Sequence, residues 1–421
     1  MEILTRAPKG TKDVLPSEVH KWHYVENILR RTAADFGCRE IRFPTFEHTE
    51  LFERGVGDTT DVVQKEMYTF TDKGGRSVSL RPEGTASVAR AFVEHSLDST
   101  GLPVKCYYIA ANFRYEKPQS GRLREHHQFG VEYFGSVSPY ADAEVIGLAD
   151  TFLKRLGIDE IRVNINSVGC PECRGGYQAA LREYFSSRKD ELCETCQGRL
   201  EKNPMRIIDC KSPVCSEISK GAPRTIDFLC DDCRDHFEAL KSRLFDMGID
   251  YAVDSGIVRG LDYYSRTVFE FVSNRIGAQG TVCGGGRYDG LVSELGGREI
   301  PGLGFGSGIE RLIMVMEALG VEFPQPDSAD VFLAAIGENA KRRAATLAHE
   351  LRRAGVSAEY DLMDRSVKAQ MKYADKTGAR FSVVLGDDEL SDGFANLKDM
   401  ATGGTVSVPI SGAEGIIKAI K

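Results

Sequence analysis

The sequence lacks any apolar run long enough to span a bilayer, and its start, MEILTRAPKGTKDVLP, has no hydrophobic signal-peptide segment. It also lacks internal repeats and low-complexity segments. The formal net charge of -8 shows no overall basic excess, so any contact with nucleic acid must use local basic patches. We therefore expect a cytoplasmic protein with no membrane partner.

Two further absences concern motifs. The glycine-rich stretches lack the Gly-x-Gly-x-x-Gly spacing, between a strand and a helix, that a dinucleotide-binding loop requires. No kinase signature or other recognisable fused domain is present. The common nucleotide-binding folds are therefore not indicated.

The 421 residues, 42% of them hydrophobic, exceed what one compact core holds, so two or three domains are expected. Periodicity predicts a helix over 17–36 and a strand over Arg39–Glu47 with Pro44 inside it. Cysteine pairs and short helical patterns suggest an insertion over about 170–248. After a Pro-rich polar stretch, alternating strand and helix patterns indicate a separate small α/β domain.

The most informative stretch, FRYEKPQSGRLREHHQFGVE at 113–132, alternates like two strands joined by a long polar loop. It concentrates guanidiniums beside acidic and amide groups: Arg114, Glu116, Arg122, Arg124, Gln128 and Glu132. Guanidinium forks match phosphate oxygens in bidentate pairs, so the hairpin is suited to hold a polyphosphate beside a small polar molecule. An ordinary exposed, charged hairpin is the alternative interpretation.

Four glycines alternate in GLGFGSGIER: Gly302, Gly304, Gly306 and Gly308. Alternate residues of a strand share one face, so the pattern predicts a bare face on which a planar ring can lie. Arg311 begins the following helix and could fold over such a ring. Glycines that only mark a strand bulge are the structural alternative.

Two other segments are weak evidence on their own. VRGLDYYSRTVFEF places Arg259 before a glycine turn, with Tyr263 and Tyr264 after it. Gly284–Gly290 reads as a flexible loop that could approach a ligand closely.

Together, these segments resemble the histidyl-tRNA synthetases, a family of class II aminoacyl-tRNA synthetases. Pro44 is similar to the proline that ends motif 1 of the class, the 113–132 hairpin to motif 2, and GLGFGSGIERL to motif 3. RGLDYY at 259–264 and GTVCGGGRYDGL at 280–291 resemble segments particular to the histidine family. The resemblance covers nearly the whole chain.

The resemblance implies an α+β class II catalytic domain over 1–325, with an antiparallel sheet flanked by helices and the small inserted domain. A linker at 326–330 and an anticodon-binding α/β domain over 331–421 follow. The implied activity joins L-histidine to tRNA(His) through a histidyl-adenylate, using ATP with Mg²⁺. The implied assembly is a homodimer whose interface includes Pro44.

The resemblance also implies the site residues. Those for histidine are Glu83, Gly84, Thr85, Gln128, Glu132, Tyr263 and Tyr264. Those for ATP are Arg114, Glu116, Arg122, His126 and Arg311. Arg114 and Arg259 are the implied catalytic residues at the α-phosphate. His126 departs from the family, which usually has a phenylalanine that stacks on adenine; a neutral imidazole can also stack.

Eight cysteines lie in the insertion, and most are spaced Cys-x₂-Cys: Cys170, Cys173, Cys193, Cys196, Cys210, Cys215, Cys230 and Cys233. Repeated pairs of this spacing are typical of structural zinc held by four thiolates. Unliganded, reduced thiols are the alternative, and the resemblance implies no metal here.

A regulatory protein is the main competing interpretation: the synthetase-like subunit of ATP phosphoribosyltransferase. That subunit lacks the C-terminal domain and degrades the ATP motifs, whereas Arg114, Glu116 and Arg311 are present here. A nucleic-acid-sensing module fused to another domain is a third class, for which no partner domain is visible.

Overall fold

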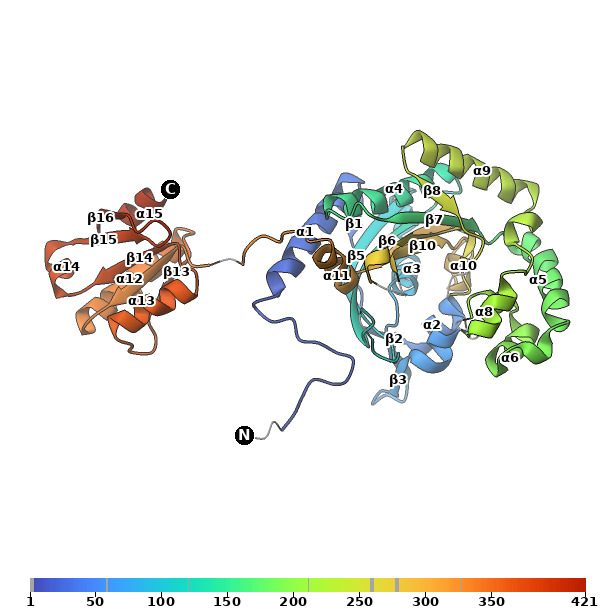
Figure 1. Cartoon of the computed structure of the whole chain (residues 1–421), viewed down its shortest axis with the longest axis horizontal. Coiled ribbons are helices and arrows are strands. Elements are labelled where there is room, and N and C mark those ends of the chain that lie inside the picture. Colours follow the sequence, from blue (N-terminus) through green and yellow to red (C-terminus); the bar gives the residue numbers. More distant parts are fainter. Residues whose placement is uncertain are drawn as a thin grey trace. The chain divides into compact units, whose positions relative to one another are not determined.

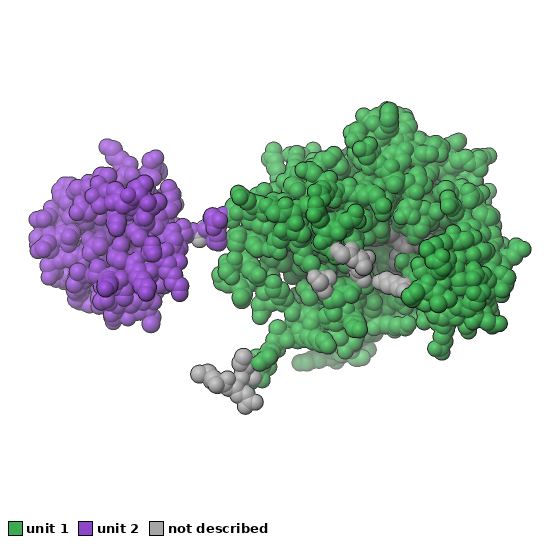
Figure 2. Space-filling view, in the orientation of Figure 1, with its two compact units in different colours: residues 1–324 green, residues 325–421 purple. Residues whose placement is uncertain are grey.

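The computed structural model describes residues 4–57, 60–119, 121–210, 212–257, 261–276, 280–326 and 328–421. The chain divides into two compact units, Met1–Pro324 and Gln325–Lys421 (Figures 1 and 2). Among the described residues, no helix is long and apolar enough to cross a membrane.

The first unit is built on an eight-stranded sheet in the order β1-β5-β6-β11-β10-β9-β7-β8. The bounds are β1 Arg39–Glu40, β5 Val104–Phe113, β6 Glu125–Phe134, β7 Arg162–Ser167, β8 Tyr251–Val253, β9 Ser265–Val272, β10 Thr281–Arg287 and β11 Gly302–Gly308. Neighbours pair antiparallel except at the two edges, where β1 and β8 run parallel to β5 and β7. The predicted antiparallel sheet and its long hairpin, β5–β6, are confirmed.

Helices cover both faces of this sheet (Figure 1). One face packs on α1 Val19–Asp35, α4 Pro139–Arg155, α9 Asp231–Asp246 and α11 Ile309–Ala318. The other meets α3 Thr85–Glu94, α10 Leu291–Glu294 and the insertion. Because strand side chains alternate, Phe129 and Val131 enter the first core, whereas Gln128 and Glu132 face the other way.

The insertion, between β7 and β8, consists of two 16-residue helices, α5 and α9, with three shorter ones between them. Its bounds are α5 Pro171–Ser186, α6 Glu194–Lys202, α7 Met205–Ile208, α8 Pro213–Ser219 and then α9. Single helical turns occur at Lys189–Glu191 and Thr225–Phe228 here, and elsewhere at Val62–Glu66, Leu97–Thr100 and Asn274–Ile276.

A three-stranded sheet, in the order β2-β4-β3, lies beside α2 Thr49–Val56. Its strands are β2 Phe46–His48, β3 Tyr68–Thr71 and β4 Ser77–Leu80. The single strand expected over Arg39–Glu47 is therefore wrong: its two ends join different sheets and Pro44 lies between them. Proline has no N–H to donate to a ladder, and the carbonyl of Pro44 instead accepts from Arg81 Nη1 at 2.7 Å.

The flexible loop expected at Gly284–Gly290 is also wrong over its first half, which belongs to β10 in the middle of the large sheet. The glycines there serve packing. A Cβ on Gly285 would lie 2.0 Å from the carbonyl oxygen of Gly304, and one on Gly286 would lie 2.5 Å from that of Thr267. Neighbouring strands approach too closely for any side chain.

The second unit is a mixed five-stranded sheet in the order β13-β12-β14-β15-β16. Its elements are β12 Val331–Ala335, α12 Glu338–Arg353, β13 Ala358–Tyr360, α13 Val367–Lys376, β14 Phe381–Leu385, α14 Asp387–Asp392, β15 Phe394–Asp399, β16 Thr405–Pro409 and α15 Glu414–Ile420. The predicted α/β alternation is present. Sequence periodicity missed α14 and β15, since FANLKD is short and only half apolar.

Candidate functional site

A cavity of about 900 Å³ opens on the sheet face that carries Gln128. Its walls come from the β5–β6 hairpin, β10, β11, the start of α3 and the segment around Tyr264. The segments singled out in the sequence, hundreds of residues apart, thus meet at one place.

One end of the cavity is acidic and buried. Glu83 accepts hydrogen bonds from the backbone N–H groups of Thr85 (2.9 Å) and Ala86 (2.7 Å) at the start of α3. Thr85 Oγ1 donates to Glu132 Oε1 at 2.7 Å, and Glu132 also accepts from the hydroxyls of Tyr108 and Tyr288. We call Glu83, Thr85, Glu132 and their hydroxyl partners the acidic end.

Burial sets the protonation of this end. It raises the pKa of Glu132 to about 8, against the hydroxyl donors that favour the carboxylate. It raises the pKa of Glu83 as well, although two backbone N–H groups and the charge of Arg114 oppose the rise. Glu132 is fully buried, and two of the residues that donate hydrogen bonds to it, Thr85 and Tyr108, line the cavity.

Two glycines position Tyr108. A Cβ on Gly84 would lie 2.3 Å from the tyrosine ring, and one on Gly130 would lie 2.0 Å from it. The ring therefore occupies a slot between α3 and β6 that only glycine leaves open. Tyr108 and Tyr288 were missed by the sequence reasoning, although Gly130, the register partner of Tyr108, signals such a close approach.

Tyr263 and Tyr264 close the acidic end, with ring centroids 4.7 Å apart. Tyr263 also packs edge-on against Tyr288, at 5.6 Å between ring centroids, and its hydroxyl lies 3.5 Å from Glu83 Oε2. Both rings line the cavity and are nearly buried. Arg259 belongs to the same sequence segment but lies outside the described residues.

A second part of the cavity, which we call the guanidinium end, contains Arg114, Arg122 and Arg311. Arg114 Nε donates to the carbonyl of Pro82 at 2.8 Å, and Arg311 Nε donates to that of Gly121 at 2.9 Å. Arg122 Nε lies 2.6 Å from a carboxylate oxygen of Glu116. Neutral backbone carbonyls thus anchor Arg114 and Arg311, and Glu116 lies close to both Arg122 and Arg114, 4.0 Å from Nη1 of the latter.

His126 lines the guanidinium end. Burial, followed by the charge of Arg114, lowers its pKa to about 3, so the imidazole is neutral at physiological pH. The next residue, His127, contacts Glu310 through Nδ1 at 3.0 Å, and this hydrogen bond raises its pKa. The pKa values of these adjacent histidines are thus shifted in opposite directions.

The glycines of β11 leave only part of their face bare. A Cβ on Gly302 would meet the Tyr288 ring at 2.2 Å, one on Gly304 the Glu132 carboxylate at 2.2 Å, and one on Gly306 the Gln128 amide at 2.6 Å. Around Gly308 the nearest side-chain atom is 3.9 Å away. The expected floor for a planar ring is therefore confined to the Gly308 end of the strand, which lines the cavity.

The insertion brings its cysteines into two groups of four, Cys170, Cys173, Cys230 and Cys233 in one and Cys193, Cys196, Cys210 and Cys215 in the other. Within each group all sulfur atoms lie within 4.8 Å of one another. All eleven cysteines of the chain are described, and none forms a disulfide. The sequence spacing indicated the pairs but not which pairs meet.

An antiparallel sheet that carries arginines above a glycine strand, with a second α/β unit after it, defines a class II aminoacyl-tRNA synthetase. The family model described as "Histidyl-tRNA synthetase" matches residues 10–172 and 225–312, and "Anticodon binding domain" matches 330–420. The first match leaves out 173–224, which is most of the insertion.

Individual relatives agree. The chain is 59% identical to "Histidine--tRNA ligase" of Acetivibrio thermocellus, over 95% of this chain and 96% of that protein. It is 56% identical to the protein of the same name from Caldanaerobacter subterraneus subsp. tengcongensis, over 99% and 100%. A crystal structure of apo S. aureus histidyl-tRNA synthetase superposes with a TM-score of 0.84 at 38% identity, covering 99% of this chain and all of that chain. The chain belongs to the histidyl-tRNA synthetase family.

Proposed function

We propose that this chain is a histidine–tRNA ligase, which activates L-histidine with ATP to histidyl-adenylate and transfers the histidyl group to tRNA(His). The observation that carries the proposal is the single cavity with a buried acidic end and a guanidinium end. Full-length relatives named as ligases favour this activity over a regulatory subunit of ATP phosphoribosyltransferase, as does the C-terminal unit.

We assign histidine to the acidic end. Glu83 and Thr85, on either side of the α3 N-cap Gly84, would bind the α-amino group together with Gln128. The amide oxygen of Gln128 accepts a hydrogen bond from Asn112 at 2.7 Å, which fixes its position. Buried polar groups that expect a partner reject ligands unable to supply one, which accounts for selectivity at this end.

Glu132 and Tyr264 would read the two imidazole nitrogens, with Tyr263 lining the pocket. The fully buried Glu132 is held by three hydroxyls, and those of Thr85 and Tyr108 come from residues that line the cavity. The position of the Glu132 carboxyl relative to the ring is therefore set before the ligand enters.

We assign ATP to the guanidinium end. Arg114 would hold the α-phosphate and the histidine carboxylate, while Glu116, Arg122, His126 and Arg311 would contact the adenine and the outer phosphates. The adenine would lie on the bare part of β11 near Gly308, beside the neutral ring of His126. The adenine ring can stack on the uncharged imidazole, as aromatic rings do on one another.

The first step is in-line attack of a histidine carboxylate oxygen on the α-phosphorus, with pyrophosphate as the leaving group. Two anions approach each other, so positioning and positive charge supply the rate enhancement, and no covalent enzyme nucleophile takes part. Arg114 and Arg259 would supply that charge. Mg²⁺ would neutralise the outer phosphates, and Glu116, Glu270 and Glu310, which line the cavity, would offer it carboxylate oxygens.

Transfer to tRNA(His) would use the second unit for the anticodon. We assign residues 1–325 to the catalytic domain, 326–330 to a linker and 331–421 to the anticodon-binding domain. We propose that the protein acts in the cytoplasm.

We propose a homodimer with Pro44 in its interface. Pro44 is exposed, and the adjacent small sheet presents the apolar side chains of Phe46 and Phe70, 57% and 48% exposed, on one face. A surface of this kind is typical of subunit contacts. Light scattering of the purified chain should give twice the monomer mass, and Phe46→Asp with Phe70→Asp should give the monomer.

Histidine-dependent exchange of pyrophosphate into ATP, followed by charging of tRNA(His), tests the proposed function. We expect exchange with histidine and none with other amino acids; a chain that binds histidine but does not exchange would instead be a regulatory protein. Arg259→Ala should reduce exchange strongly, and near wild-type exchange in that variant would remove Arg259 from the mechanism.

A further inference from the structure

We propose that the insertion binds two structural zinc ions, one in each group of four cysteines. This inference concerns residues outside the cavity and does not depend on the proposed function. The family match leaves out Cys173 and the whole of the second group.

The sulfur geometry fits a single tetrahedral ion in each group. With Zn–S bonds of about 2.3 Å, the four sulfurs around one zinc are about 3.8 Å apart. The Sγ–Sγ distances are 3.6 Å for Cys170–Cys173, 3.9 Å for Cys170–Cys230 and 3.8 Å for Cys193–Cys210. An iron–sulfur cluster distributes its four thiolates over two or more irons, and would hold some of the sulfurs farther apart than the 4.8 Å within which all four lie here.

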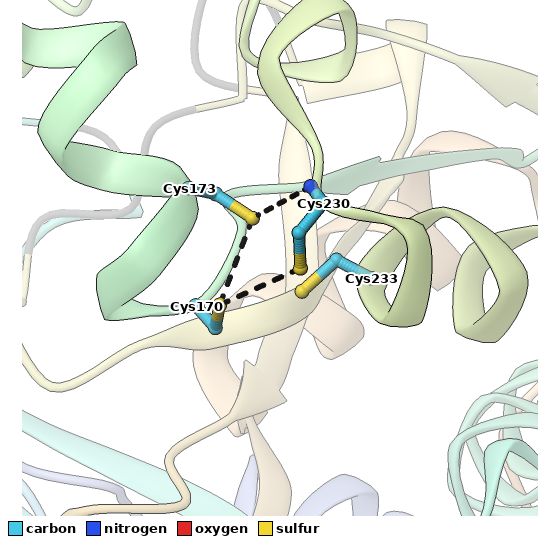
Figure 3. A group of neighbouring side chains, drawn as sticks. All are labelled: Cys170, Cys173, Cys230 and Cys233. Atoms are coloured by element: carbon cyan, nitrogen blue, oxygen red, sulfur yellow. Dashed lines mark hydrogen bonds between the residues drawn. The ribbon is translucent and has the colours of Figure 1, made fainter.

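The first group closes the insertion at its base. Cys170 and Cys173 lie at the start of α5, Cys230 and Cys233 lie at the start of α9, and the four side chains converge (Figure 3). Gly169, with φ +68°, permits the approach, because a Cβ there would lie 2.7 Å from that of Cys173. One ion here would join the chain where it enters and where it leaves the insertion.

The backbone around the first group is arranged for a thiolate. The N–H of Cys230 donates to Cys173 Sγ at 3.1 Å. Cys170 and Cys230 are the N-cap residues of their helices, where the helix dipole favours negative charge. Such hydrogen bonds to ligand atoms are usual around bound metals.

The second group repeats this arrangement within the insertion. Cys193 is the N-cap of α6, and its N–H donates to Cys215 Sγ at 3.2 Å. In each group two of the four residues are buried and two are half-buried, which leaves a path for the ion to enter.

The short helices of the insertion would gain stability from bound metal. The helices α6, α7 and α8 have nine, four and seven residues, below the length at which isolated helices persist in water. Two four-thiolate sites would add folding free energy to that which these helices gain by packing on the second core of the first unit.

Metal analysis of protein purified without chelator tests the proposal. We expect about two equivalents of zinc per chain, one for each four-thiolate group. Cys173→Ser with Cys233→Ser should retain only the second ion, and Cys196→Ser with Cys215→Ser only the first. Cys106→Ala, a buried cysteine outside both groups, is the matched control and should keep both ions.

Replacement by cobalt provides a second readout that needs no variant to fold. Cobalt bound to wild-type protein should show the charge-transfer and d–d absorption of tetrahedral thiolate coordination, and zinc should displace it. Less than about a tenth of an equivalent of zinc overturns the proposal. So does stoichiometric iron, or disulfides within either group.

Discussion

The two ends of the cavity manage charge in opposite ways. At the acidic end, Glu83 and Glu132 are buried among hydroxyls and backbone N–H groups, and burial raises the pKa of both. At the guanidinium end, backbone carbonyls position Arg114 and Arg311, and burial together with the charge of Arg114 lowers the pKa of His126. One end therefore discriminates by hydrogen bonding, and the other attracts phosphate.

The contributions of Glu132 and His126 to stability depend on pH in opposite ways. Glu132 has a raised folded-state pKa, so its stabilising contribution is present below the ordinary glutamate pKa and is lost as pH rises to about 8. His126 has a lowered folded-state pKa, so its contribution is present above the ordinary histidine pKa and is lost as pH falls to about 3.

The largest expected effect is at the guanidinium end. Arg114→Lys keeps the charge but loses the planar fork that pairs with phosphate and carboxylate oxygens. We expect kcat/KM for histidine-dependent ATP–pyrophosphate exchange to fall by about 10²–10³-fold, as for other losses of transition-state stabilisation. Arg76→Lys, exposed and paired with Asp72, is the matched control and should not change exchange. A loss below tenfold would mean that charge alone suffices at this position.

At the acidic end, Glu132→Gln should raise KM for histidine by about 10- to 100-fold, the size of one buried hydrogen bond. KM for ATP should change little, because the guanidinium end is intact. The variant should also flatten the decline of Tm between the ordinary glutamate pKa and about pH 8. Glu53→Gln, exposed on α2, should keep the wild-type slope. An unchanged slope in Glu132→Gln would show that Glu132 is not the titrating group.

The sequence predicted the acidic and guanidinium ends unequally. The hairpin, the alternating glycines and the helix from Thr85 follow from local periodicity, and their side chains do line one cavity. Arg114, Arg122 and Arg311 were visible because arginines on a polar hairpin and after a glycine strand already indicate phosphate.

The acidic end depends on contacts between distant strands, which periodicity does not carry. Tyr108 and Tyr288 reach Glu132 only because Gly84, Gly130 and Gly302 leave room for their rings. Gly285 and Gly286 likewise read as a loop until their strand neighbours are known. For the same reason the grouping of the cysteines could not be predicted from spacing.

Gly84→Ala tests whether this glycine leaves the room that the Tyr108 ring occupies. Its φ of -95° and ψ of -30° suit alanine, so only the contact with the Tyr108 ring opposes the change. We expect destabilisation by about 1–3 kcal/mol from overpacking, with a several-fold rise in KM for histidine. Gly290 is the matched control: it also precedes a helix, at φ -90° and ψ -14°, but its added Cβ would be 3.7 Å from the nearest atom. Equal melting temperatures for the two variants in thermal unfolding would contradict the slot for Tyr108.

The smallest expected effect separates two adjacent histidines. His126→Phe exchanges one neutral ring for another, so KM for ATP should stay within about threefold of wild type. His126 has a lowered pKa, so wild-type protein loses stability as pH falls and the phenylalanine variant does not lose this contribution. The Tm of the variant minus that of wild type should therefore be more positive at pH 5 than at pH 7.5. His127 has a raised pKa through Glu310, so its contribution is lost as pH rises, and His127→Phe should lower Tm more at pH 5 than at pH 8. Thermal unfolding of both variants across this range checks the signs, and the same sign for both would mean that Glu310 and the arginines do not control these rings.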